Sequence, residues 1–275
     1  MNCAWKQLMN ILPPRLRGGV DQLGRETMEE LRLRLGSPPE ITGGGKSTWL
    51  PGAVTQEELT CVVNAASQYS PWAAATVAQG YLTAPGGHRI GLCGEAVCRD
   101  GKMEGIRQVR SLCIRVARDF PGIARGAANL PGSVLILGPP GWGKTTLLRD
   151  LARQKSDTFQ VSVVDERGEL FPQCFAQGRR LDILTGCPKP QGIGLVLRTM
   201  APAYIALDEI TAEADCEALI HGANCGVRFL ATAHASSVRD LRERDIYRPL
   251  LEQKIFSEIL LMHADKSYTR ERMAL

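Results

Sequence analysis

The residues with the clearest chemistry lie in one run, residues 138–146, with the sequence GPPGWGKTT. The run fits the pattern G-x-x-x-x-G-K-[ST], in which glycines let backbone N–H groups turn onto phosphate oxygens. Lys144 would reach the β- and γ-phosphates, and the hydroxyl of Thr145 would bind Mg²⁺. The expected contacts of a nucleoside triphosphate are therefore Gly138, Pro139, Pro140, Gly141, Trp142, Gly143, Lys144, Thr145 and Thr146.

The segments on either side of this run support the same interpretation. Residues 133–137 are largely apolar and predict a buried strand, and residues 146–153 predict a helix. The N-terminus of a helix carries partial positive charge, which favours a phosphate there. A glycine-rich structural turn is the alternative, but the full motif between a strand and a helix favours nucleotide binding.

A second feature is the apolar segment 204–209, YIALDE, which ends in two acids. This is the pattern of a Walker B strand, and it follows the phosphate-binding run at a suitable distance. Asp208 would lie at the carboxyl end of the strand and hold Mg²⁺ directly or through water. Glu209 would orient or deprotonate the attacking water.

Two further polar segments follow strand-like runs. Glu166, in VVDERGE (residues 163–169), is a second candidate for the general base, with a solvated turn as the alternative. His234, in TAHASS (residues 232–237), would sense the γ-phosphate or relay a proton, with a hydrogen-bonded structural histidine as the alternative. Because parallel strands end at one ligand crevice, we expect both side chains near the phosphate-binding run.

An arginine could stabilise charge in the transition state, either in the same chain or from a neighbouring subunit. The sequence does not choose among the candidates, and each one also has an ordinary role as a surface or ion-pair residue. The candidates are Arg89, Arg115, Arg118, Arg179, Arg180 and Arg198.

Composition limits the class of protein. The chain has 275 residues, 44% of them hydrophobic and 23% charged, as in ordinary globular proteins. A net charge of +4 and only 5% aromatic residues argue against a nucleic acid partner. The nine cysteines form no C-x-x-C pair and their number is odd, which favours reduced thiols over disulfides or a zinc site.

The sequence contains no secretory signal and no stretch long enough to span a membrane, so we expect any membrane contact to go through partner proteins. An apolar stripe near the N-terminus could lie on a membrane surface. We expect it instead to pack onto the body of the protein, as most amphipathic helices do. The stripe consists of Ala4, Trp5, Leu8, Met9 and Leu12.

The pattern before residue 130 predicts a small α+β domain. Residues 30–36 and 111–118 alternate as half-buried strands do, and residues 80–83 and 89–98 are also strand-like. Thr55 and Glu58 form a capping box that begins a helix reaching to about residue 69. The pair Asp100-Gly101 predicts a hairpin turn.

The pattern after residue 130 predicts alternating strands and helices, with the strands buried on both faces. This indicates a three-layer α/β nucleotide-binding core. The predicted domains are therefore residues 1–130 and residues 131–275, with the loop-rich segment 121–131 as their border. The predicted strands of the core are residues 133–137, 160–165, 203–208, 228–233 and 257–262.

With these motifs assembled, the chain resembles the stage III sporulation protein AA family of endospore-forming bacteria, a relative of the type II and type IV secretion ATPases. The resemblance covers nearly the whole chain, and three stretches make it specific beyond the phosphate-binding run. These are GGHRIGL (residues 86–92), VVDERGEL (residues 163–170) and TGCPK (residues 185–189).

The resemblance implies a RecA-like P-loop ATPase core, with Glu166 in an acidic box and His234 in a histidine box. Because Asp208 and Glu209 are both present, Glu166 and Glu209 both remain candidates for the base. Members of the family are thought to work in the mother-cell cytoplasm, and the related secretion ATPases work as hexamers, so the resemblance implies a hexameric ring. Such rings would act on membrane-bound subunits of a channel between mother cell and forespore.

The leading hypothesis from the sequence is a Mg²⁺-dependent ATPase that drives this transenvelope complex. The alternative is a scaffold that assembles on binding ATP and hydrolyses little of it. A DNA or RNA motor is disfavoured because the chain lacks the basic, aromatic-rich surface that such a motor needs.

Overall fold

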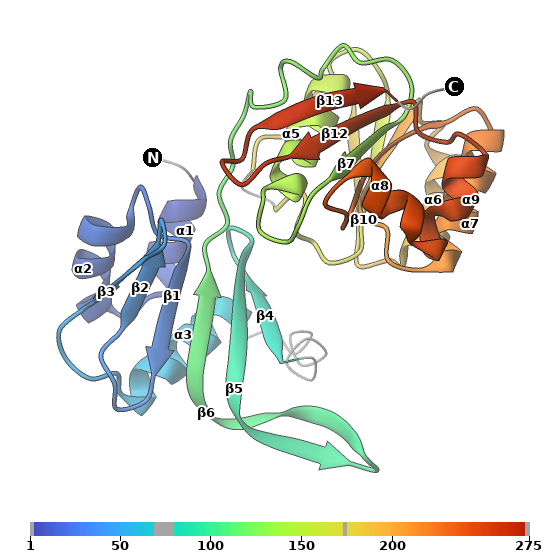
Figure 1. Ribbon diagram of the computed structural model, residues 1–275. Helices are drawn as coiled ribbons and strands as arrows, with labels where there is room; N and C mark the ends of the chain where they lie inside the picture. Colours follow the sequence, from blue (N-terminus) through green and yellow to red (C-terminus); the bar gives the residue numbers. More distant parts are fainter. Residues whose placement is uncertain (1–2, 69–79, 173–174, 273–275) are drawn as a thin grey trace. The chain divides into compact units, whose positions relative to one another are not determined.

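The computed structural model describes residues 3–68, 80–172 and 175–272. The chain divides into two compact units (Figure 1). Unit 1 comprises Met1–Asp119 with Pro172–Phe175, and unit 2 comprises Phe120–Phe171 with Ala176–Leu275. The sequence-based border lay after residue 130, so residues 120–130 fall in unit 2 rather than in the N-terminal part.

The reason is a set of contacts made by this connecting segment. The backbone N–H groups of Gly122 and Ala124 donate to the buried carboxylate of Asp150, at 3.0 and 2.8 Å. Ala124, Ala127 and Leu130 are buried in the apolar core of unit 2. A segment rich in small residues therefore becomes part of the packed unit.

Unit 1 is an antiparallel sheet in the order β3-β2-β1-β6-β5-β4, with helices packed against it. The predicted capping box is present, because Thr55 accepts from the N–H of Glu58 and the Glu58 side chain returns to Thr55. Trp5, Leu8 and Leu12 are buried in the core, which confirms that the N-terminal stripe packs onto the protein. The elements are α1 (Cys3–Ile11), α2 (Pro14–Gly24), β1 (Glu30–Arg34), β2 (Glu40–Gly43), β3 (Lys46–Trp49), α3 (Gln56–Ser67), β4 (Tyr81–Ala84), β5 (His88–Arg99) and β6 (Lys102–Arg115).

Unit 2 is a seven-stranded sheet in the order β13-β12-β7-β11-β10-β8-β9, parallel except for β13. All five predicted strands of the core are present, although β9 and β13 were not predicted. The elements are β7 (Val134–Leu137), α5 (Lys144–Lys155), β8 (Val161–Asp165), β9 (Leu181–Thr185), α6 (Lys189–Thr199), β10 (Tyr204–Glu209), α7 (Glu213–Asn224), β11 (Arg228–Ala233), α8 (Val238–Glu243), the short 3₁₀ helix η2 (Asp245–Tyr247), α9 (Arg248–Glu252), β12 (Glu258–Met262) and β13 (Tyr268–Arg272).

The sheet of unit 2 is covered on both faces. Val134 and Ile136 of β7 pack with α5, whereas Leu135 and Leu137 of the same strand pack with α6, α7 and α9. This arrangement is the predicted three-layer α/β core, and α5 lies on one side of the sheet in Figure 1 with α6 and α7 on the other. Within the described part of the chain, no helix is long and apolar enough to cross a membrane.

Candidate nucleotide-binding site

The phosphate-binding run connects β7 to α5, as the motif requires. Its backbone is left-handed at Gly141 (φ 78°) and at Gly143 (φ 95°), a conformation that residues with a Cβ rarely adopt. Gly143 directly precedes the helix, which begins at Lys144. The loop of residues 138–143 therefore leads directly into the N-terminus of α5, where free backbone N–H groups favour the binding of an anion.

Lys144 is almost fully buried, with 6% of its surface exposed. Its ammonium donates to the backbone oxygen of Pro139 at 3.1 Å and to Nδ1 of His234 at 2.8 Å. Burial lowers the pKa of Lys144, and the nearby carboxylates of Glu209 and Asp208 oppose that shift. The lysine is thus held by the backbone of its own loop and by His234, which directly follows β11.

His234 joins Lys144 to Glu209. Nε2 of His234 lies 2.8 Å from Oε2 of Glu209, and Nδ1 faces Lys144. A neutral imidazole with its proton on Nε2 satisfies both contacts, since it accepts from the lysine and donates to the carboxylate. The three predicted residues form a continuous chain of polar contacts along the carboxyl ends of β10 and β11.

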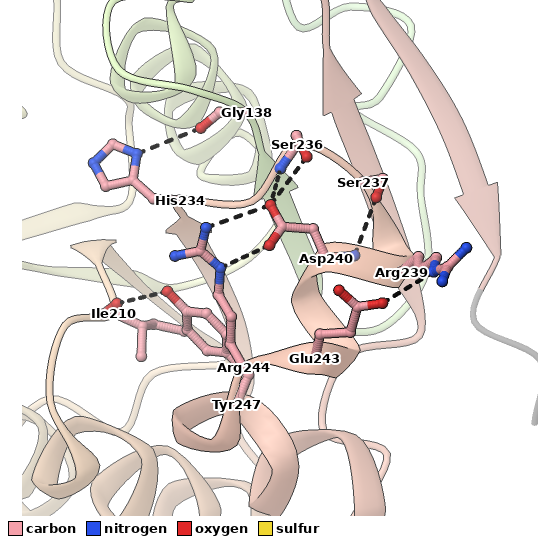
Figure 2. A network of polar contacts seen from close by, with 10 residues as sticks. All are labelled: Gly138, Ile210, His234, Ser236, Ser237, Arg239, Asp240, Glu243, Arg244 and Tyr247. Carbon is pink, nitrogen blue, oxygen red and sulfur yellow. Dashed lines mark hydrogen bonds and ion pairs between the residues drawn. The ribbon is translucent and has the colours of Figure 1, made fainter.

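The segment after β11 is fixed by a network of its own (Figure 2). Asp240 accepts from the N–H of Ser236 at 2.7 Å and from Arg244 at 2.9 Å, and these bonds, led by Arg244, lower the pKa of Asp240 to about 2. Ser237 caps α8 by accepting from the N–H of Asp240. The position of His234, whose Nδ1 also lies 3.4 Å from the backbone oxygen of Gly138, is therefore set by the turn that follows it.

Thr145 and Asp208 are the predicted metal ligands, and they are in contact. The Thr145 hydroxyl donates to Oδ1 of Asp208 at 3.2 Å. Between Leu207 and Glu209 the pairing of β10 with β11 shifts, so Asp208 is an extra residue in the strand. Such a bulge re-aims side chains, and here it lets consecutive acids contact Thr145 and His234 separately.

The residues at this position fit a Mg²⁺ ion. Burial raises the pKa of Asp208, and the negative charge of Glu169 raises it further, so a cation bound here would stabilise the ionised carboxylate. Among the described residues, no group of three or more His, Cys, Asp or Glu side chains could hold a metal alone. One carboxylate and one hydroxyl suit Mg²⁺, which usually takes its remaining ligands from phosphate and water.

Glu166 is placed differently from Glu209. Its Oε2 lies 2.8 Å from Nζ of Lys189, and 42% of its side-chain surface is exposed. Glu166 and Glu209 nevertheless line the same small cavity, of about 20 Å³. That volume has room for about one water molecule.

The sequence did not single out three residues that shape this part of the site. Asp165 is 1% exposed and accepts from the N–H groups of Glu169 and Leu170 at 2.9 and 2.8 Å, so it folds the acidic loop. The negative charge of Glu169 raises the pKa of Asp208. Lys189 pairs with Glu166. All three lay in stretches that the sequence marked: Asp165 and Glu169 in VVDERGEL, and Lys189 in TGCPK.

The six candidate arginines are divided between the units. Arg115 pairs with Glu30 at 3.3 Å, and Arg118 donates to the backbone oxygens of Gly24 and Met28. These contacts are internal to unit 1. The candidates of unit 1 are Arg89, Arg115 and Arg118, and those of unit 2 are Arg179, Arg180 and Arg198.

Comparison with known proteins identifies the family. Residues 4–272 match the family described as Sporulation stage III, protein AA. The chain belongs to this family. It is 33% identical to Stage III sporulation protein AA of Bacillus subtilis (strain 168), over 92% of this chain and 89% of that protein.

Solved structures of an ATPase and of a pilus motor share the fold of this sporulation protein AA family member. The ATPase DotB of Legionella pneumophila has a TM-score of 0.61 at 16% identity, with 94% of this chain and 78% of that chain covered. The pilus retraction motor PilT, solved with bound ADP, has a TM-score of 0.62 at 13% identity, covering 90% and 76%. The predicted RecA-like α/β fold, related to secretion ATPases, is thereby confirmed.

Proposed function

We propose that this protein is a Mg²⁺-dependent ATPase. The observation that carries the proposal is the chain Lys144–His234–Glu209, which joins the phosphate-binding loop to a carboxylate through contacts of 2.8 Å each. A merely structural glycine loop has no need of a buried lysine linked to two strand ends. The shared fold with ATPases supports the same conclusion.

In the proposed reaction, the triphosphate lies on the N–H groups of residues 138–146, and Lys144 exchanges His234 for the γ-phosphate. Glu209 orients a water molecule and accepts its proton while the water oxygen attacks the γ-phosphorus. The bond from phosphorus to the bridging oxygen breaks, leaving ADP and inorganic phosphate. Thr145 and Asp208 would hold Mg²⁺, which neutralises the charge on the phosphates.

Glu209 is assigned as the base in preference to Glu166. Glu209 contacts His234, and therefore the lysine that binds the phosphate, whereas Glu166 contacts Lys189. His234 can report the occupancy of the γ-phosphate position to Glu209, because one of its ring nitrogens contacts Lys144 and the other contacts Glu209.

The cellular role is proposed from the family. We infer a homo-oligomeric ring, hexameric as in related secretion ATPases, that works in the mother-cell cytoplasm. It would act through membrane-bound sporulation channel subunits and without nucleic acid. The mass of the purified protein by size-exclusion and light scattering, with and without ATP, tests the ring.

The activity itself is tested by Mg²⁺-dependent phosphate release from ATP. Wild-type protein should turn over, and Lys144→Ala should lose turnover while its melting curve stays cooperative. Wild-type release no faster than that of Lys144→Ala would contradict an ATPase. ATP binding without turnover would favour the assembly scaffold.

A further inference from the structure

Lys189, the first residue of α6, forms an ion pair with Glu166 in which the lysine is the less exposed partner. Its side chain is 11% exposed, and its ammonium lies 2.8 Å from Oε2 of Glu166. Lysine is seldom so enclosed unless it is paired, because its charge is strongly hydrated. The contact therefore reflects a specific role at this position rather than a chance surface ion pair.

The same ammonium lies 3.6 Å from Oδ2 of Asp215, a second buried acid. Asp215 accepts from the N–H groups of Thr211 and Ala212, at 2.9 and 3.2 Å, and so fixes the turn between β10 and α7. Lys189 thus links two turns that follow neighbouring strands, one after β8 and one after β10. These are the turns next to the acids of the site.

The pair also forms part of the wall of the small cavity. Glu166, Lys189, Asp208 and Glu209 all line this space of about 20 Å³. The three carboxylates around this space repel one another. Two cations, Arg167 and Lys189, also line it, and Lys189 pairs with Glu166 at 2.8 Å. A half-exposed Glu166 without this cation would gain solvent by turning out of the cavity.

We propose that Lys189 is a positioning residue of the hydrolysis site. It holds the carboxylate of Glu166 at the wall of the one-water cavity, where Glu166 helps Glu209 to orient the attacking water. Lys189 acts through Glu166 and touches neither nucleotide nor metal. The inference rests on the proposed ATPase function and deepens it.

The test is a double-mutant cycle on ATP turnover with Lys189→Met, Glu166→Gln and the combined variant. Methionine keeps the alkyl stem of the lysine and removes only its charge. Each single change should lower kcat by about 10- to 100-fold, as loss of positioning does, with KM changed by about twofold or less. The combined variant should be no slower than the slower single variant, because both changes remove one interaction.

Lys189→Arg should restore most of the turnover, since it returns a cation to the same carboxylate. Arg239→Ala is the matched control, because it removes the exposed cation of an ion pair with Glu243 at 2.9 Å (Figure 2). Its turnover should equal that of wild type. Melting curves for all variants show whether folding is intact.

Three outcomes would overturn the inference while the ATPase stands. They are wild-type turnover by Lys189→Met, losses that multiply in the combined variant, and no rescue by Lys189→Arg. A wild-type protein without turnover, by contrast, overturns the proposed function and the positioning role with it. The failure of each claim is therefore recognised separately.

Discussion

The ammonium of Lys144 lies 2.8 Å from Nδ1 of His234, although the two residues are 90 positions apart in the chain. The contact exists because β11 pairs with β7 in parallel, so that both strands end at the same edge of the sheet. Lys144, which would bind phosphate, thus contacts His234, and His234 also contacts the carboxylate of Glu209.

Removal of His234 should uncouple the lysine from Glu209. We expect His234→Ala to bind ATP but to release phosphate about 100-fold more slowly, since a proton-handling group contributes on this scale. Phosphate release and ATP-induced thermal shift measure the two effects. His263→Ala, which removes a histidine bonded to Thr269, is the control and should keep full turnover. Equal losses in both variants would argue against a specific role for His234.

Asp208 should make the protein less stable in the absence of Mg²⁺ and nucleotide. Because burial raises its pKa, the ionised form costs free energy in the folded state. This group's contribution to stability is complete below the ordinary aspartate pKa and is lost as pH rises through the raised value.

The consequence at neutral pH is that Asp208→Asn should raise the melting temperature of the metal-free protein. The expected gain is about 2–4 °C per kcal/mol for a chain of this size. The same variant should lose the stabilisation that Mg²⁺ and ATP together give to wild type. Asp157→Asn, at an exposed position, should show neither effect. A metal-free Asp208→Asn protein that melts below wild type would contradict this account.

Asp165 should be required for the fold of the acidic loop rather than for the reaction. Asp165→Ala leaves the N–H groups of Glu169 and Leu170 without their acceptor, at a cost of about 1–3 kcal/mol in the free energy of unfolding. Denaturant titration measures the loss, with Asp157→Ala as an unaffected control. An Asp165→Ala protein as stable as wild type would assign this carboxylate to another role.

The strands that carry the site could be predicted because they are short apolar runs beside recognisable turns. Val134–Leu137 is buried throughout, and Tyr204–Glu209 is buried apart from its last two residues, as parallel core strands are. Leu181–Thr185 was missed because this edge strand is only half-buried and contains polar residues, which leaves no clear pattern.

Which side chain each acid of the site contacts could not be predicted from the sequence. Glu166 and Glu209 were equivalent candidates there, because each follows an apolar run. They differ in their partners, because Glu166 contacts Lys189 and Glu209 contacts the ring of His234. These contacts depend on the order of the strands and on the turn that carries Lys189. Apolar runs identify strands but do not encode which strands are neighbours.

The most direct test of the central claim compares Glu209→Gln with Glu166→Gln in one assay of ATP binding and Mg²⁺-dependent phosphate release. Both variants keep the shape of the side chain and remove its charge. The account predicts that Glu209→Gln binds ATP but loses turnover by about 100- to 10,000-fold, as expected for a general base, with a smaller loss for Glu166→Gln. Wild-type turnover by Glu209→Gln, with turnover abolished in Glu166→Gln, would contradict it.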